Sequence, residues 1–90
     1  MIRVNDEFVI TVNDCTYIAA VDKHKTDKEG KPMYKTIGSY PSVKMALKGI
    51  FKYKARIVLG EGEKTITEAI NALETIENEF EEALQVVKDI

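Results

Sequence analysis

The chain has 90 residues, of which 44% are hydrophobic and 31% are charged, and its formal net charge is −2. This composition excludes the disordered and membrane classes, and a chain of this length builds one hydrophobic core, so we expect a single domain over residues 1–90. Because Cys15 is the only cysteine and no apolar signal segment precedes it, the sequence excludes internal disulfides and predicts a cytoplasmic protein with no membrane partner.

Charge is divided unevenly along the chain. Residues 1–60 contain eleven lysines and arginines against six acidic residues, whereas residues 61–90 contain two against nine. Two interpretations follow from this asymmetry. Either the acidic segment lies against the basic one and neutralises it, or each surface binds an external partner. The sequence leaves both interpretations open.

Residues 1–40 have the pattern of a β-meander. Residues 8–12 and 16–21 are rich in β-branched and aromatic side chains, with a turn signal between them. The polar residues 25–31 have the composition of a hairpin loop, and a third strand follows over residues 32–37. A meander of three strands is not stable alone, so we expect helices to cover its apolar face.

A basic helix is predicted over residues 42–59. Ser42 is a suitable N-cap, apolar side chains recur at helical spacing after it, and two glycines end the segment. On the other side of the helix every fourth residue is basic, which is either a solvated face or a surface for an anionic partner. We call this set the basic stripe: Lys44, Lys48, Lys52 and Arg56.

A long acidic helix is predicted over residues 65–90, which completes an α+β fold of order β-β-β-α-α. Thr65 and Glu68 match the capping-box pattern of a helix start. Spacings of three and four residues between apolar side chains then continue to residue 90, as in a heptad repeat. The members of this pattern are Ile66, Ala69, Leu73, Ile76, Phe80, Ala83, Val87 and Ile90.

The length of the acidic helix predicts self-association. At about 1.5 Å per residue it is about 39 Å long, so it overhangs the sheet and the shorter helix. Large apolar side chains left in water would each forgo about 1.5–3 kcal/mol, unless a partner covers them or the last turns fray. We therefore predict a homo-oligomer with coiled-coil packing, or a bound protein in the same place. Its expected interface is Leu73, Ile76, Phe80, Val87 and Ile90.

The sequence offers no set of residues for catalysis or for metal binding. His24 is the only histidine and lies beside the predicted hairpin loop, so a general base and a histidine-based zinc site both lack partners. Cys15 lies at a predicted turn without an adjacent histidine to activate it. We therefore predict a protein that is not an enzyme and uses no cofactor and no metal.

The first half of the chain resembles a known DNA-binding module. Residues 8–49 combine a β-hairpin that has a Lys- and Gly-rich tip with the sequence G-S-Y-P-S-V-K-M-A-L-K. This pattern is similar to the strand-strand-strand-helix domains at the N-termini of phage integrases, and the resemblance implies DNA binding through the sheet. The chain departs from that family because an acidic helix stands where integrases continue into further domains.

The whole chain resembles a group of short uncharacterised proteins of phages and prophages from Gram-positive bacteria. A β-meander precedes the helix start Y-P-[ST]-x-x-x-A-L, which is Tyr40 to Leu47, and the second helix starts with T-[IL]-x-E, which is Thr65 to Glu68. These motifs are capping and packing signals. The resemblance implies a phage accessory protein in the cytoplasm of the host cell, such as one that blunts a host defence system.

The favoured hypothesis is a non-enzymatic phage protein that binds a host protein. A row of carboxylates on the acidic helix suits the basic cleft of a nuclease-based defence effector, which the chain would inhibit or redirect as an anti-CRISPR candidate. The residues expected to bind it are Glu74, Glu77, Phe80, Glu81, Glu82 and Leu84.

Two alternative functions are retained. The first is a DNA-binding accessory or regulatory protein, because lysines surround the predicted hairpin and the basic stripe adds further cations. Its expected contacts are Lys23, Lys25, Lys31, Lys35, Lys44, Lys48, Lys52 and Arg56. The second is a self-assembling structural protein of the virion or its scaffold. Target identity, oligomer number and helix orientation are not specified by the sequence.

Overall fold

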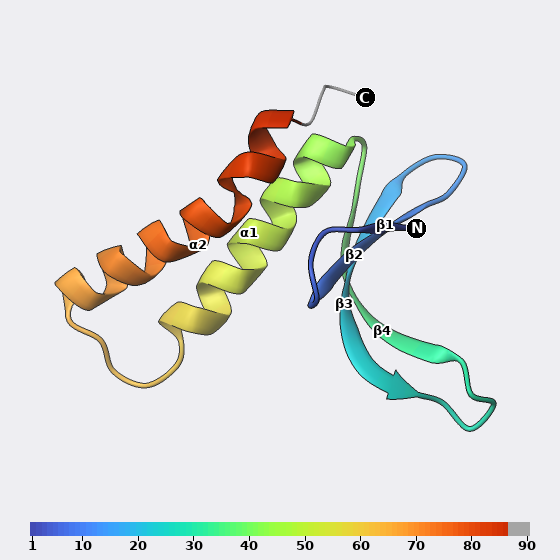
Figure 1. Cartoon of the computed structure of the whole chain (residues 1–90), viewed down its shortest axis with the longest axis horizontal. Coiled ribbons are helices and arrows are strands. Elements are labelled where there is room, and N and C mark those ends of the chain that lie inside the picture. The colour runs from blue at the N-terminus through green and yellow to red at the C-terminus, as the bar shows by residue number, and fades with distance from the viewer. Residues whose placement is uncertain (87–90) are drawn as a thin grey trace.

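Four antiparallel strands and two helices form the fold of the computed structural model, which describes residues 1–86 (Figure 1). The sheet has the spatial order β1 (Ile2–Arg3), β2 (Phe8–Val12), β3 (Tyr17–Thr26) and β4 (Pro32–Tyr40). Helices α1 (Val43–Leu59) and α2 (Ile66–Val86) follow and lie side by side on one side of the sheet (Figure 1). The side chains at positions 82, 83, 84 and 86 are outside the description. The α+β class is confirmed, with all strands preceding both helices.

The sheet contains one strand more than the sequence predicted. β1 has only two residues and pairs antiparallel with β2. A turn joins them, in which Asn5 Oδ1 accepts hydrogen bonds of 2.9 Å from the backbone N–H groups of Glu7 and Phe8. The prediction of three strands was wrong on this point because a two-residue strand is too short to show a repeating pattern.

The second hairpin has longer strands and a shorter loop than predicted. β3 extends to Thr26, so only residues 27–31 form the connection to β4. Asp27 Oδ1 fixes this turn by accepting hydrogen bonds from two backbone N–H groups, one of them from Lys31 at 2.9 Å. Gly30 adopts a φ of 82°, in the left-handed region that favours glycine. The hairpin end projects away from the two helices (Figure 1).

The two faces of the sheet have different surroundings. Ile10 of β2 lies opposite Ala19 of β3, and both are buried in the hydrophobic core beneath the helices. Arg3, Val9 and Ala20 form the neighbouring cross-strand row, which faces away from the helices because side chains alternate along a strand. The core cluster shared with the helices therefore lies on one face of the sheet, while Val9 and Ala20 are buried on the other face.

Helix α1 begins where the sequence predicted it. Ser42 is the N-cap, and its Oγ accepts a hydrogen bond of 3.1 Å from the backbone N–H of Met45. Gly60 is the C-cap with right-handed backbone angles, and the left-handed position falls two residues later at Gly62, where φ is 70°. These two glycines separate the helices by a short loop.

Helix α2 begins immediately after Thr65. The Thr65 hydroxyl accepts a hydrogen bond of 3.2 Å from the backbone N–H of Glu68 and donates one of 3.1 Å to the Glu68 carboxylate. The threonine half of the predicted capping box is confirmed, while the glutamate binds the hydroxyl in place of the threonine backbone. In residues 1–86 neither helix combines the length and the apolar character needed to cross a membrane.

The hydrophobic core passes from the sheet through α1 to α2. Phe8 of β2 and Phe80 of α2 are each 1% exposed, and their ring centroids lie 6.3 Å apart. Phe51 of α1 contacts Phe80 edge-to-face with the same centroid separation. The other large buried side chains contributed by the helices are Leu47, Ile50 and Ile76. Phe80 therefore packs α2 against both α1 and the sheet.

Candidate functional site

A hollow of about 340 Å³ opens beside α1 and the end of β4. Three members of the basic stripe line it, namely Lys48, Lys52 and Arg56, so the spacing of four residues brings these cations to one surface. The other lining residues are apolar or aromatic, with one glycine. We call this site the basic hollow, and its remaining members are Ile37, Tyr40, Met45, Gly49 and Tyr53.

Two glycines make room for the ring of Tyr40 in the basic hollow. A Cβ atom on Gly49 would overlap the Tyr40 hydroxyl oxygen, and one on Gly38 would lie 3.0 Å from it. The tyrosine ring therefore packs between the backbone of β4 and the backbone of α1. This contact explains why a glycine occupies the middle of a helix.

Tyr53 forms the second aromatic wall of the basic hollow. One side of its ring meets Phe8 edge-to-face, with centroids 6.2 Å apart and an interplanar angle of 86°. Lys35 Nζ lies 5.7 Å from the ring centroid in a cation–π contact. Lys35 of β4 thereby brings a further cation to a ring that lines the basic hollow.

The cations of the basic hollow are not neutralised by α2. Within residues 1–86, no ion pair joins Lys48, Lys52 or Arg56 to a described acidic side chain. A described ion pair of α1 uses Lys54, whose Nζ lies 2.6 Å from a carboxylate oxygen of Glu7. Of the two interpretations of the charge asymmetry, internal neutralisation therefore does not apply to these three cations.

Only one of the hairpin lysines that were predicted to bind nucleic acid lies near the hollow beside α1. Lys23, Lys25 and Lys31 are exposed on the hairpin that projects away from α1, and Lys31 pairs with Glu29 at 3.6 Å (Figure 1). Lys35 alone among the predicted hairpin contacts reaches the hollow, through Tyr53. Lys44, the remaining member of the stripe, does not line the hollow.

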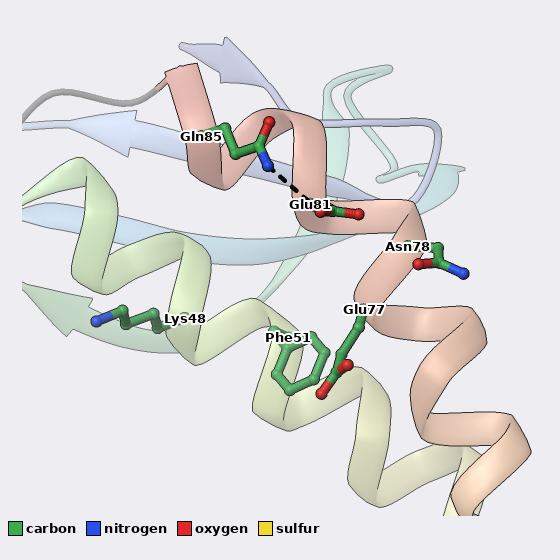
Figure 2. Close-up of a pocket in the computed structure, with 6 residues that line it drawn as sticks. All are labelled: Lys48, Phe51, Glu77, Asn78, Glu81 and Gln85. Atoms are coloured by element: carbon green, nitrogen blue, oxygen red, sulfur yellow. Dashed lines mark hydrogen bonds between the residues drawn. The ribbon is translucent and has the colours of Figure 1, made fainter.

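A second hollow, of about 540 Å³, lies between α1 and α2 (Figure 2). We call it the helix groove. Gln85 Nε2 donates a hydrogen bond of 3.3 Å to Glu81, while Lys48 is directed away from the carboxylates on the facing helix (Figure 2). Two of the predicted partner-binding residues, Glu77 and Glu81, therefore share one concave surface. The lining residues are Lys48, Phe51, Glu77, Asn78, Glu81 and Gln85.

Phe80 and Ile76, which were predicted to face a partner, point into this chain in the structure. They are 1% and 3% exposed in the core of this chain, because α2 turns them toward α1 and β2. Leu73 is half-buried against the same core, and Glu74 is exposed outside the groove. The predictions for the side chains of Glu82 and Leu84, and for Val87 and Ile90, lie outside the described residues.

Hydrogen bonds hold the pKa of the Asp22 carboxyl below its ordinary value. The largest cause is the backbone N–H of His24, which donates to Oδ1 at 2.8 Å, and Arg3 Nη2 adds a bond of 2.9 Å to Oδ2. His24 has a φ of 54° and is exposed. Cys15 is also exposed. In residues 1–86 no three His, Cys, Asp or Glu side chains cluster as metal ligands.

The site residues predicted from the sequence did not include Tyr40 and Tyr53, the aromatic walls of the basic hollow. A signal was present, since Tyr53 directly follows Lys52 in the basic stripe, and aromatic residues among cations are typical of surfaces that bind nucleic acids. Tyr40 had no such signal because its position depends on how β4 meets α1. Comparisons with protein-family models, curated proteins and solved structures found no match for this chain.

Proposed function

We propose that the chain is a non-enzymatic accessory protein that binds nucleic acid in the basic hollow. The observation that carries this proposal is the meeting of unneutralised Lys48, Lys52 and Arg56 with Tyr40 and Tyr53 in one concave site. Cations neutralise phosphates and release their counterions, while aromatic rings bind bases by stacking. The hollow supplies both kinds of group within one helix and its neighbouring strand.

The basic hollow is a better nucleic-acid surface than the outward face of the sheet. On that face Arg3 Nη2 lies 2.9 Å from Asp22 Oδ2, so its charge is already compensated. Lys35, by contrast, lies opposite Val21 in the row that includes buried Phe8, which directs it toward the helix side. We therefore place the contact on α1 and β4, in contrast to the sheet-mediated binding of integrase arm-binding domains.

Fluorescence anisotropy of a labelled oligonucleotide at about 50 and 200 mM salt tests the proposal. If four cations each contact a phosphate, raising the salt over this range should reduce the affinity about a hundredfold. Lys52→Glu should weaken binding about tenfold at the lower salt and reduce the salt slope, because it removes one phosphate contact.

Lys28→Glu is the matched control because it makes the same charge change on the exposed hairpin connection. It should leave the affinity within about twofold of wild type, since it lies outside the hollow. Equal weakening by both variants would show a general charge effect, and absence of binding at about 50 mM salt would reject the proposal.

A host protein is the second candidate partner, and the helix groove favours it. Glu77 and Glu81 stand beside the exposed part of Phe51 in a concavity of about 540 Å³. A basic side chain of a partner protein would find two carboxylates there, next to an aromatic ring. Phage origin, and with it inhibition of a defence nuclease, rests on the sequence resemblance.

The test for this candidate is retention of a host protein by the immobilised chain. Glu77→Lys together with Glu81→Lys should abolish retention, whereas Glu61→Lys together with Glu63→Lys, in the loop between the helices, should not. A protein that is retained equally by all three forms does not use the groove.

A further inference from the structure

The basic hollow has the wrong shape for a double helix and a suitable one for a single unpaired base. Its volume of about 340 Å³ is in the range of pockets that enclose small molecules, which is about 300–1,000 Å³. In a duplex the bases are stacked inside, and only phosphates, sugars and base edges in the grooves reach a protein. The tyrosine rings inside the hollow would therefore have no partner in an intact duplex.

Tyr53 is oriented to stack with a base. The edge contact with Phe8 fixes the ring plane, and Lys35 marks the direction of the ring face, 5.7 Å from its centroid. Since Tyr53 is half-buried, the ring is held by the core while part of it lines the hollow. A base would stack on this face in place of the exposed Lys35 side chain, on a ring that is already immobile, so little entropy of the ring is lost on binding.

The tyrosine hydroxyls are available for hydrogen bonds to a base. Neither the Tyr40 hydroxyl nor the Tyr53 hydroxyl has a hydrogen-bond partner among the described residues, and neither is a buried unsatisfied atom. The Tyr40 hydroxyl is held between Gly38 and Gly49 at the wall of the hollow. Both tyrosines line the hollow, so their hydroxyl groups are the candidate hydrogen-bonding groups for a base there.

The cations lie along a line that a nucleic-acid backbone can follow. Lys48, Lys52 and Arg56 rise about 6 Å per step along α1, since each step is four residues at about 1.5 Å per residue. Phosphates on either side of a base in the hollow would lie beside this line, and Lys35 adds a cation at the Tyr53 ring. Stacking within a positively charged groove is the recognition mode of single strands.

We infer that the ligand of the basic hollow is single-stranded nucleic acid, with one unpaired base against Tyr53 and its flanking phosphates along Lys48, Lys52 and Arg56. This inference rests on the proposed function and adds the strand state of the ligand. It also defines separate roles, in that the ring determines the preference for single strands and the cations determine the dependence on salt.

The test compares a labelled single strand of about 12 nucleotides, a duplex of the same length and a free nucleoside monophosphate as competitor. The single strand should bind at least about tenfold more tightly than the duplex, and the mononucleotide should compete only weakly because it has one phosphate. Binding should quench tyrosine fluorescence, which is readable directly because the chain contains no tryptophan.

Three variants separate the ring from the charges. Tyr53→Leu should reduce single-strand affinity about tenfold and leave the salt slope unchanged, since no phosphate contact is lost. Tyr53→Phe keeps the ring and should stay within about threefold of wild type, which also controls for damage to the contact with Phe8. Lys52→Glu should show the opposite pattern, with a reduced salt slope and a retained preference for single strands.

Each alternative result is decisive. Equal affinity for single strand and duplex, with no effect of Tyr53→Leu, would overturn the inference and leave the proposed function standing. A mononucleotide that competes as well as the oligonucleotide would also overturn it, since the ligand would be a small molecule. Absence of binding to every probe would overturn both the inference and the proposed function.

Discussion

Gly49 lies in the middle of α1, where glycine costs about 0.5–1 kcal/mol relative to alanine. The ring of Tyr40 occupies the space that a side chain at this position would need, because its hydroxyl group lies where the Cβ atom would be. The helix therefore gives up intrinsic stability so that the strand and the helix can approach. The same contact shapes one wall of the basic hollow.

Gly49→Ala should consequently destabilise the protein although alanine is the better helix former. We expect a net loss of about 1–3 kcal/mol, measured by urea denaturation, because the overpacked ring must move. In a Tyr40→Leu background the same substitution should be neutral or stabilising by up to about 1 kcal/mol. Stabilisation by Gly49→Ala in the wild-type background would contradict the close contact.

Asp22 of β3 makes the stability of the protein depend on pH in the acidic range. Its folded pKa is lowered by the His24 backbone N–H and by Arg3, so its stabilising contribution is complete above the unfolded pKa of about 4. The contribution is lost as the pH falls from about 4 through the folded pKa, where the carboxylate takes up a proton.

Asp22→Asn should lower the urea midpoint at neutral pH, and its difference from wild type should shrink as the pH falls below about 4. Arg3→Gln keeps the His24 donor and should show a smaller change of the same kind. A difference between wild type and Asp22→Asn that stays constant from neutral to acidic pH would exclude this role of Asp22.

At the scale of elements, apolar side chains of the same heptad pattern in α2 differ in burial along the helix. Ile66, at the start of the helix, is 77% exposed, whereas Phe80, two heptads later, is 1% exposed between α1 and β2. Both residues occupy heptad positions, so the pattern alone gives them equal weight. Burial depends on where the neighbouring α1 and β2 end. The spacing of apolar residues within α2 carries no information about this.

Phe80→Ala should cost about 3–5 kcal/mol of unfolding free energy, because it leaves a cavity where three layers meet. Ile66→Ala is the matched control from the same heptad pattern and should stay within about 0.5 kcal/mol of wild type. Thermal or urea unfolding followed by circular dichroism measures both. Similar losses for the two variants would contradict the arrangement of α2.

The sequence predicted the elements well and the site only in part, for a physical reason. Capping at Ser42 and Thr65 and the repeat of the basic stripe are interactions between residues a few positions apart, so they can be read along the chain. The walls of the basic hollow come from residues that meet across β4 and α1. Tyr40 and Gly49 meet because of the crossing of these two elements, which local patterns do not specify.

At the scale of the molecule, opposite charges occupy neighbouring concave surfaces. The protein measures 43 × 36 × 18 Å, and Lys48 of α1 lines both the basic hollow and the helix groove. A single helix thus separates a cationic site from one that contains Glu77 and Glu81. The two proposed partners, a nucleic acid and a protein, would therefore bind on opposite sides of α1.

Each strand of the sheet pairs with the strand that is next to it in the sequence. The helices likewise form a hairpin joined by a short loop, so the contacts within each layer connect nearby parts of the chain. Closing short loops costs little entropy, and proteins rich in such local contacts fold within about microseconds to milliseconds. Docking of α2 closes a much larger loop, because Phe80 and Phe8 contact each other across most of the sequence.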